Sequence, residues 1–118
     1  MKKIALEEHF TTRAFLEHLR ARKDFPRLAA GPNDTEVLYR TPTSTQPLSR
    51  AQVNRLLDMG AGRLAEMDRA GIDMQVLSMT WPGVEELDPA AAAEFARQSN
   101  DELAQAIQFF GINPYRIR

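Results

Sequence analysis

Glu7 and His9 are two potential metal ligands that stand two residues apart near the start of the sequence. In an extended strand, side chains two residues apart point to the same face of the backbone. We therefore expect Ala5, Glu7 and His9 to share one face. The other face would carry the remaining residues of the run, Ile4, Leu6, Glu8 and Phe10. Carboxylate oxygen and neutral imidazole nitrogen are ordinary ligands of zinc and similar divalent ions.

Two ligands do not complete a metal site, because structural and catalytic sites take three or four protein ligands. A motif as short as Glu-x-His also occurs often by chance. The spacing alone therefore favours a strand end whose polar residues simply face water, and a metal site at Glu7 and His9 needs support from the rest of the chain.

The residues after this pair predict a helix and then a long loop. Thr11 and Thr12 offer a cap for a helix that we expect from Arg13 to Arg22. Residues 24–48 are rich in proline, threonine and other turn-forming residues, and we expect a long loop with little regular structure there. Such a loop is either functional or a mobile surface segment, and the sequence leaves both interpretations open.

A helix followed by a strand is predicted in the middle of the chain. A capping-box pattern at Ser49 opens a helix over residues 49–70, with a kink or break near Gly60. Gly71 fits the left-handed position that follows a helix end. Residues 72–79 then predict a second strand. This order is typical of a parallel α/β unit.

Thr80 and Trp81 directly follow the second strand. The carboxyl ends of parallel strands lie at one edge of the sheet, and the loops there carry the chemistry of α/β folds. We therefore expect both residues on the same rim as Glu7 and His9, in contact with a substrate. For Trp81 a second interpretation is open, in which the indole is a packing lid over the mouth of the fold.

A last helix is predicted from Asp88 to Phe110, where Gly111 ends it. The full pattern indicates an α/β protein with about two parallel strands and three or four helices. Two parallel strands form a marginal sheet that needs cover on both faces. The chain is therefore either the start of a larger fold or takes its missing strands from a partner.

Composition limits the function classes further. The 118 residues suffice for one small domain over residues 1–118, and 43% hydrophobic with 26% charged residues is ordinary for a globular protein. The net charge of −1 gives no electrostatic reason to expect nucleic acid or a membrane surface as a partner. The lack of cysteine excludes disulfides and thiolate chemistry, and we expect a cytoplasmic protein.

Several runs of the sequence resemble one enzyme family. They are Lys3–Phe10, Arg63-Leu64 with Met67-Asp68, Gly71-Ile72, Val76–Ser78, Ala96-Arg97 with Asn100-Asp101, and Pro114–Ile117. Together they resemble the amidohydrolase superfamily, in the branch that contains aminocarboxymuconate-semialdehyde decarboxylase and the γ-resorcylate and other hydroxybenzoate decarboxylases. The likeness covers most of the chain but not residues 24–48.

This resemblance implies the N-terminal portion of a (β/α)₈ TIM barrel, left incomplete, with one divalent metal ion, zinc or manganese, in the complete enzyme. Glu7 and His9 match the first-strand ligand pair of the family. The family's other ligands, a histidine and an aspartate, and its acid–base residues belong to strands beyond Arg118, so the resemblance places no catalytic residue in this chain. A glutamate as first ligand favours decarboxylation over hydrolysis.

The implied function is that of an N-terminal fragment of a non-oxidative decarboxylase of an aromatic or unsaturated carboxylic acid, inactive as an isolated chain. Its partner would be a small-molecule carboxylate substrate, and a homo-oligomer is left open. The alternatives are a fragment of a hydrolase of the same superfamily and a non-catalytic module that docks on a full-length homologue. A self-standing small α/β domain, in which Glu7 and His9 face solvent, is a further alternative.

Overall fold

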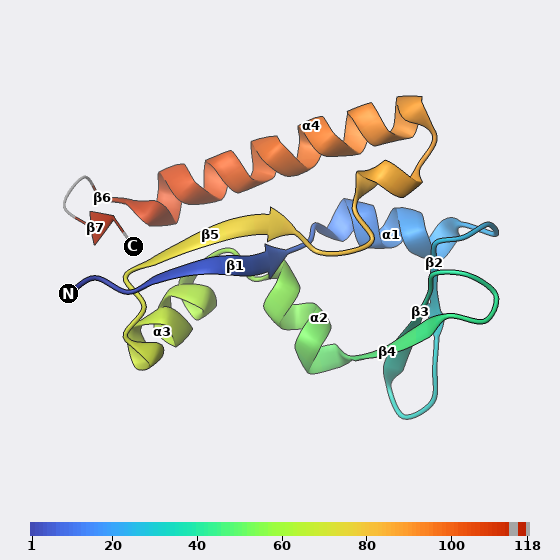
Figure 1. Cartoon of the computed structure of the whole chain (residues 1–118), viewed down its shortest axis with the longest axis horizontal. Helices are drawn as coiled ribbons and strands as arrows, with labels where there is room; N and C mark the ends of the chain where they lie inside the picture. Colours follow the sequence, from blue (N-terminus) through green and yellow to red (C-terminus); the bar gives the residue numbers. More distant parts are fainter. Residues whose placement is uncertain (114–115, 118) are drawn as a thin grey trace.

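The structure is a computed structural model that describes residues 1–113 and 116–117 of the chain, with side chains up to residue 110. Its elements follow one another as shown in Figure 1. They are β1 (Ile4–Phe10), α1 (Arg13–Ala21), β2 (Arg27–Ala30), β3 (Thr35–Tyr39), β4 (Thr45–Ser49), α2 (Arg50–Leu57), α3 (Ala61–Ala70), β5 (Met74–Met79), the 3₁₀ turn η1 (Val84–Glu86), α4 (Pro89–Ala106), the π-turn η2 (Ile107–Gly111), β6 (Ile112–Asn113) and β7 (Arg116–Ile117).

The strands β1 and β5 form a parallel pair, which confirms the predicted α/β architecture. Three helices, α1, α2 and α3, lie between them in the chain, and α4 runs alongside β5 (Figure 1). The predicted break near Gly60 is also confirmed, because Gly60 stands just before the first residue of α3. Gly71 ends α3 in the left-handed conformation, with φ of 66°.

A register shift in β1 changes which of its residues share a face. Ala5 and Glu8 pair with residues of β5 that are two positions apart, so both lie on one face of the sheet. His9 pairs with Ser78 on the opposite face. The expectation that Ala5 and His9 share a face is therefore wrong. An irregularity of this kind places one extra residue in a strand, and simple alternation along the sequence does not reveal it.

Residues 24–48 are not the long loop that their composition predicts. Together with Ser49 they form a three-stranded antiparallel sheet in the order β2–β3–β4. The turn-forming residues of this segment lie where such a sheet tolerates them. Asn33 and Asp34 have positive φ angles of 54° and 59° in the β2–β3 turn, as hairpin turns often require. Pro47 lies in β4, which is an edge strand and can accommodate a residue without an amide proton.

The antiparallel sheet is joined to α1 by Arg20 and Glu36. The Nε and Nη2 atoms of Arg20 donate to the two carboxylate oxygens of Glu36 at 2.6 and 2.9 Å. This hydrogen bonding raises the pKa of Arg20 above its usual value, against the opposing effect of burial. The pair spans 16 positions of sequence and links the helix to the sheet.

The buried core lies between α1, the antiparallel sheet and α2. Its buried members are Phe15, Leu16, Leu19, Leu28, Leu38, Val53 and Leu87. The antiparallel sheet contributes Leu28 and Leu38, whose exposed fractions are 2% and 3%. Because this sheet supplies core residues, the segment 24–48 is an integral part of the fold.

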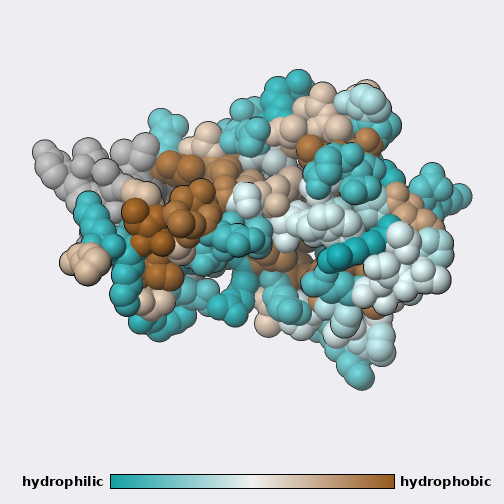
Figure 2. Space-filling model, viewed as in Figure 1, coloured by the Kyte–Doolittle hydropathy of each residue, from teal (hydrophilic) through white to brown (hydrophobic). Residues whose placement is uncertain are grey.

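The parallel pair, in contrast, leaves apolar side chains open to solvent. Ile4, Leu6 and Val76 are 50%, 76% and 49% exposed. Figure 2 shows hydrophobic residues gathered over the parallel pair, at the end where β1 and β5 begin. In a closed barrel, side chains on the inner face of the strands fill the interior. The face of this sheet that would point into the interior of a closed barrel is therefore the face that is exposed to solvent.

The C-terminal part begins with α4, for which Asp88 is the N-cap and Pro89 the first residue. The regular helix ends four residues before the predicted end at Phe110, because a π-turn follows from Ile107. Of the predicted turn Pro114–Ile117, Pro114 and Tyr115 lie outside the described residues. Within the described part of the chain, every helix is too short or too polar to cross a membrane.

Candidate metal and substrate cavity

A cavity of about 610 Å³ opens at the carboxyl ends of the two parallel strands. All four residues predicted for a site line it, namely Glu7, His9, Thr80 and Trp81. The structure thus brings together residues that are more than 70 positions apart in the chain. Their roles as metal ligands and substrate contacts stay predictions.

Hydrogen bonds between main-chain groups hold the rim of the cavity in place. The amide of Thr80 donates to the carbonyl of Phe10 at 2.8 Å, which continues the strand pairing past the end of β5. The amide of Thr11 donates to the carbonyl of Leu56 at 3.0 Å and joins the end of β1 to α2. The residues next to these hydrogen bonds in the sequence therefore have a main chain that is held in place.

The imidazole of His9 is oriented by Ser78, its neighbour across the strand pair. The Nδ1 atom of His9 lies 3.2 Å from the hydroxyl oxygen of Ser78. With the proton on Nδ1, the ring donates to Ser78 and its Nε2 lone pair is left for another partner. Metal-binding histidines are commonly held in this way, with one ring nitrogen bonded to the protein and the other on the metal.

The donor atoms near this end of β1 fit a divalent cation in kind. Glu7 offers carboxylate oxygen and His9 offers nitrogen to the same cavity. Among residues 1–110, no three His, Cys, Asp or Glu side chains lie close enough together to hold a metal ion. The pair supplies only two of the ligands that a complete site takes.

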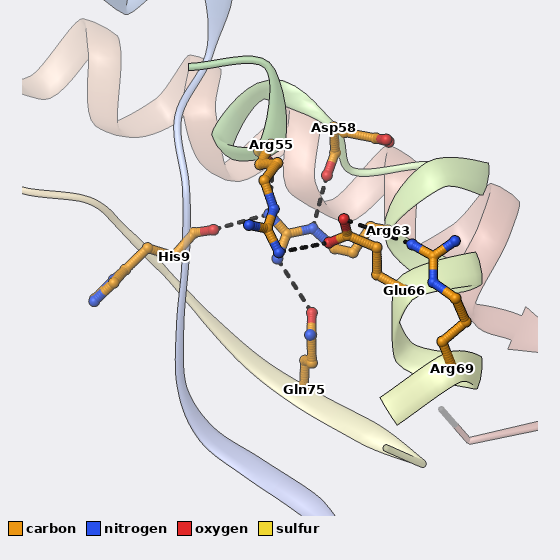
Figure 3. Close-up of polar contacts among 7 residues, drawn as sticks. All are labelled: His9, Arg55, Asp58, Arg63, Glu66, Arg69 and Gln75. Atoms are coloured by element: carbon orange, nitrogen blue, oxygen red, sulfur yellow. Dashed lines mark hydrogen bonds and ion pairs between the residues drawn. The ribbon is translucent and has the colours of Figure 1, made fainter. Parts of the chain in front are cut away.

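The backbone beneath His9 is supported by the half-buried side chain of Arg63 (Figure 3). Its Nη2 atom donates to the carbonyl of His9 at 2.9 Å, and its Nε atom donates to the carbonyl of Asp58 at 2.7 Å. The Nη1 atom donates to the side chain of Gln75 at 3.1 Å. The imidazole of His9 points away from this cluster (Figure 3), so Arg63 holds the main chain and makes no contact with the ring.

Burial lowers the pKa of Arg63 below the usual value of arginine. Three carboxylates oppose this shift, those of Glu8, Asp58 and Glu66. The carbonyl groups that Arg63 binds also favour its charged form, because they can only accept hydrogen bonds. The Arg63 side chain is thus a cation surrounded by several hydrogen-bond acceptors, which suits a structural role beneath the site.

The opposite wall of the cavity comes from the antiparallel sheet and the core. Apolar side chains of Phe15, Leu28, Leu38, Leu48 and Val53 line it. Arg40 and Gln46, which flank the hairpin loop between β3 and β4, add polar groups at the rim. A cavity with apolar walls and a few polar groups is the usual form of a small-molecule site.

Comparisons with known proteins show which proteins this chain resembles. No family model matches the chain. It is similar to the γ-resorcylate decarboxylase of Polaromonas sp. strain JS666, with 33% identity over 109 residues that cover 89% of this chain and 26% of that protein. It is also similar to the crystal structure of 5-carboxyvanillate decarboxylase from Sphingomonas paucimobilis, with 31% identity, a TM-score of 0.67 and coverage of 98% of this chain and 32% of that one.

A third similar structure is the dihydroxybenzoic acid decarboxylase of Polaromonas sp. JS666, solved with manganese and the inhibitor 2-nitroresorcinol. It has 30% identity, a TM-score of 0.64 and coverage of 98% of this chain and 28% of that one. This chain is a homologue of the amidohydrolase-superfamily decarboxylases. It spans about a quarter to a third of the length of these decarboxylases, consistent with the N-terminal part of such a barrel.

Sequence reasoning missed three residues that shape the site in this decarboxylase homologue. Ser78 lies beside His9 only because of the register shift in β1, which the sequence does not reveal. Arg63 carries no local signal, because its partners come from three different segments: β1, α2 with its C-cap, and β5. Arg40 lies in the segment predicted as loop, and only the folded hairpin places it at the cavity.

Proposed function

We propose that this chain carries the first metal-ligand strand and part of the substrate cavity of a metal-dependent, non-oxidative decarboxylase of aromatic carboxylic acids. One observation carries the proposal. Glu7 and His9 line a single cavity with Thr80 and Trp81 at the carboxyl ends of two parallel strands. This placement occurs in a chain that is 30–33% identical to decarboxylases of that kind.

Each group of the chain has a defined part in this proposal. The carboxylate of Glu7 and the Nε2 atom of His9 would hold the divalent ion, and Ser78 would keep the imidazole in the required tautomer. The ion, when bound, supplies Lewis-acid polarisation and a template for the substrate. Trp81 and the apolar wall exclude water from the ring of the substrate.

The isolated chain is expected to have no turnover and at most weak metal affinity, because two ligands do not complete a site. Manganese is the appropriate first probe, since the Polaromonas dihydroxybenzoic acid decarboxylase was solved with this metal, and zinc is the comparison. A cytoplasmic location and a homo-oligomer stay predictions from the sequence.

Metal titration tests the ligand pair directly. Isothermal titration of Mn²⁺ and Zn²⁺ into the chain should show one weak site that Glu7→Ala and His9→Ala each abolish. Glu8→Ala is the matched control, because Glu8 is an adjacent carboxylate that lines a different cavity, beside Arg63. An equal loss of metal binding in Glu8→Ala, or no loss of metal binding in Glu7→Ala and His9→Ala, would contradict the proposed site.

The reaction is tested in a chimera in which this chain replaces the matching segment of 5-carboxyvanillate decarboxylase. Release of CO₂ by the chimera, and its loss on Glu7→Ala, are the expected results. A folded chimera that binds metal and releases no CO₂ would count against decarboxylation. Release of CO₂ from 2,6-dihydroxybenzoate by the isolated chain would overturn the statement that the chain is inactive alone.

A second candidate function, a non-catalytic module that docks on a full-length homologue, is favoured by the exposed apolar face of the parallel pair. Ile4, Leu6 and Val76 are about half or more exposed. A pull-down of a full-length relative by the chain would support this candidate. A chain that fails to bind any such relative, and completes the chimera instead, would exclude it.

A further inference from the structure

Arg40 is held over the face of Trp81 at the rim of the cavity. Its guanidinium carbon lies 4.0 Å from the centre of the indole ring, a close cation–π contact. The Nη2 atom of Arg40 also donates to the side-chain oxygen of Gln46 at 3.0 Å. At the main chain, the amide of Arg40 donates to the carbonyl of Ser44 at 2.8 Å, so the residue starts a closed hairpin. The side chain is therefore restrained by two contacts, and the hairpin holds its main chain in place.

The charge of Arg40 is not neutralised by a neighbouring carboxylate. Two arginines line the cavity, Arg40 and Arg55. Arg55 forms an ion pair with Glu66 at 3.3 Å. Among the residues whose side chains the structure describes, Arg40 has no ion-pair partner, and Gln46 is a neutral acceptor.

The remaining hydrogen-bond donors of Arg40 are available to a ligand. Nη2 is bonded to Gln46, whereas Nε and Nη1 have no partner in the described part of the chain. A guanidinium that stacks on an aromatic face still presents its edge, and that edge matches a carboxylate with two parallel hydrogen bonds. The indole and Gln46 hold the group in one orientation before a ligand arrives, which reduces the entropy lost on binding.

We propose that Arg40 is the carboxylate-binding residue of this cavity and that its ligand is an aromatic acid. The inference rests on the proposed function for the class of ligand, and on the Arg40–Trp81 contact for the residue. The aromatic ring packs against the apolar wall of Phe15, Leu28 and Leu38, and Arg40 forms an ion pair with the carboxylate of the acid. The hairpin of β3 and β4 thus sets the specificity of the cavity for acids over neutral aromatic compounds.

Trp81 offers a selective readout, because it is the only tryptophan of the chain. In a ¹⁵N-labelled sample of the full chain, its indole N–H gives a single resonance that can be followed during titration with benzoate. Benzamide has the same ring and no charge, and serves as the matched ligand. We expect benzoate to shift the indole resonance, and benzamide to bind at least about tenfold more weakly, since hydrogen bonds to charged groups are the stronger ones.

Variants of Arg40 separate its role from that of the rest of the cavity. Arg40→Gln should raise the Kd for benzoate at least about tenfold, to the level of benzamide. Arg40→Lys keeps the charge and loses the planar fork, so a rise of about threefold is expected. Arg50→Gln is the control, because Arg50 is an exposed arginine that pairs with Asp34 outside this cavity. It should leave the Kd unchanged.

Equal benzoate affinity in the wild type and Arg40→Gln would overturn the inference, as would a wild-type chain that does not bind benzoate at millimolar concentrations. If Arg40→Gln loses its dispersed spectrum and is therefore unfolded, Arg40→Lys is compared with the wild type instead. An unchanged Kd for benzoate in Arg40→Lys would then overturn the inference. Mn²⁺ titration of Glu7→Ala and His9→Ala distinguishes the two proposals. Metal binding that does not depend on Glu7 and His9 would contradict the proposed function and leave the Arg40 result standing.

Discussion

The guanidinium of Arg63 in α3 donates a hydrogen bond to the main-chain carbonyl of His9 at the end of β1, with a distance of 2.9 Å. A second bond from the same nitrogen reaches the carbonyl of Arg55 at 3.2 Å. One side chain thus joins the helix α2, the helix α3 and the strand that carries the predicted ligands. The position of His9 depends on a residue that never enters the cavity beside Trp81.

Replacing Arg63 by glutamine should destabilise the chain by about 1–3 kcal/mol. The variant leaves the carbonyl of Asp58 and the side-chain oxygen of Gln75 without their donor at partly buried positions, and an unsatisfied polar group there has a cost of this order. Urea denaturation followed by circular dichroism measures the change. Arg69→Gln is the control, because Arg69 is exposed and pairs with Glu66 at 3.8 Å, which predicts a change below about 0.5 kcal/mol. Equal changes in both variants would contradict this role of Arg63.

Ser78 is expected to affect metal affinity without binding the metal. The Ser78→Ala variant removes the partner of the Nδ1 atom of His9, and loss of such a partner commonly weakens metal binding about tenfold or more. Titration calorimetry with Mn²⁺ measures the change in Kd. Ser44→Ala, at an exposed position outside the cavity, should leave the affinity unchanged. A Ser78 variant that binds as tightly as the wild type would show that the imidazole does not need this contact.

Local sequence chemistry predicted the helices and their ends well. The capping box at Ser49, the N-cap at Asp88 and the left-handed Gly71 are all present in the structure. Each depends on the residue itself and on neighbours within one turn, so the relevant interactions are visible in a short window of sequence. The placement of Thr80 near His9 followed from a general rule for parallel strands, which needs only the element order.

Features that depend on distant partners could not be predicted in this way. The register shift in β1 arises from its pairing with β5, about 70 residues later. The antiparallel sheet in residues 24–48 is specified by cross-strand pairs and by Leu28 and Leu38 packing on α1, which outweigh a turn-rich composition. The position of Arg40 over Trp81 joins the β3–β4 hairpin to the segment after β5, which lie about 40 residues apart in the sequence.

The antiparallel sheet should be required for the stability of the whole chain. Leu38 in β3 is 3% exposed and belongs to the central core cluster, so Leu38→Ala should cost about 2–5 kcal/mol. Thermal and urea denaturation measure this loss. Thr45→Ala in the exposed start of β4 is the control and should change stability by less than about 0.5 kcal/mol. Full stability of the Leu38 variant would mean that the segment is a dispensable excursion.

The exposed apolar face of the parallel pair should make the isolated chain self-associate. Leu6 is 76% exposed beside Ile4 and Val76, and the outer edges of β1 and β5 are unpaired in the described part of the chain. Leu6→Lys places a charge on this face and, because the side chain is already exposed, should change stability by no more than about 0.5 kcal/mol. Analytical ultracentrifugation should show a larger monomer fraction for this variant than for the wild type. Ala14→Lys adds the same charge at an exposed position of α1 and controls for net charge, so an equal rise in both variants would place the association elsewhere.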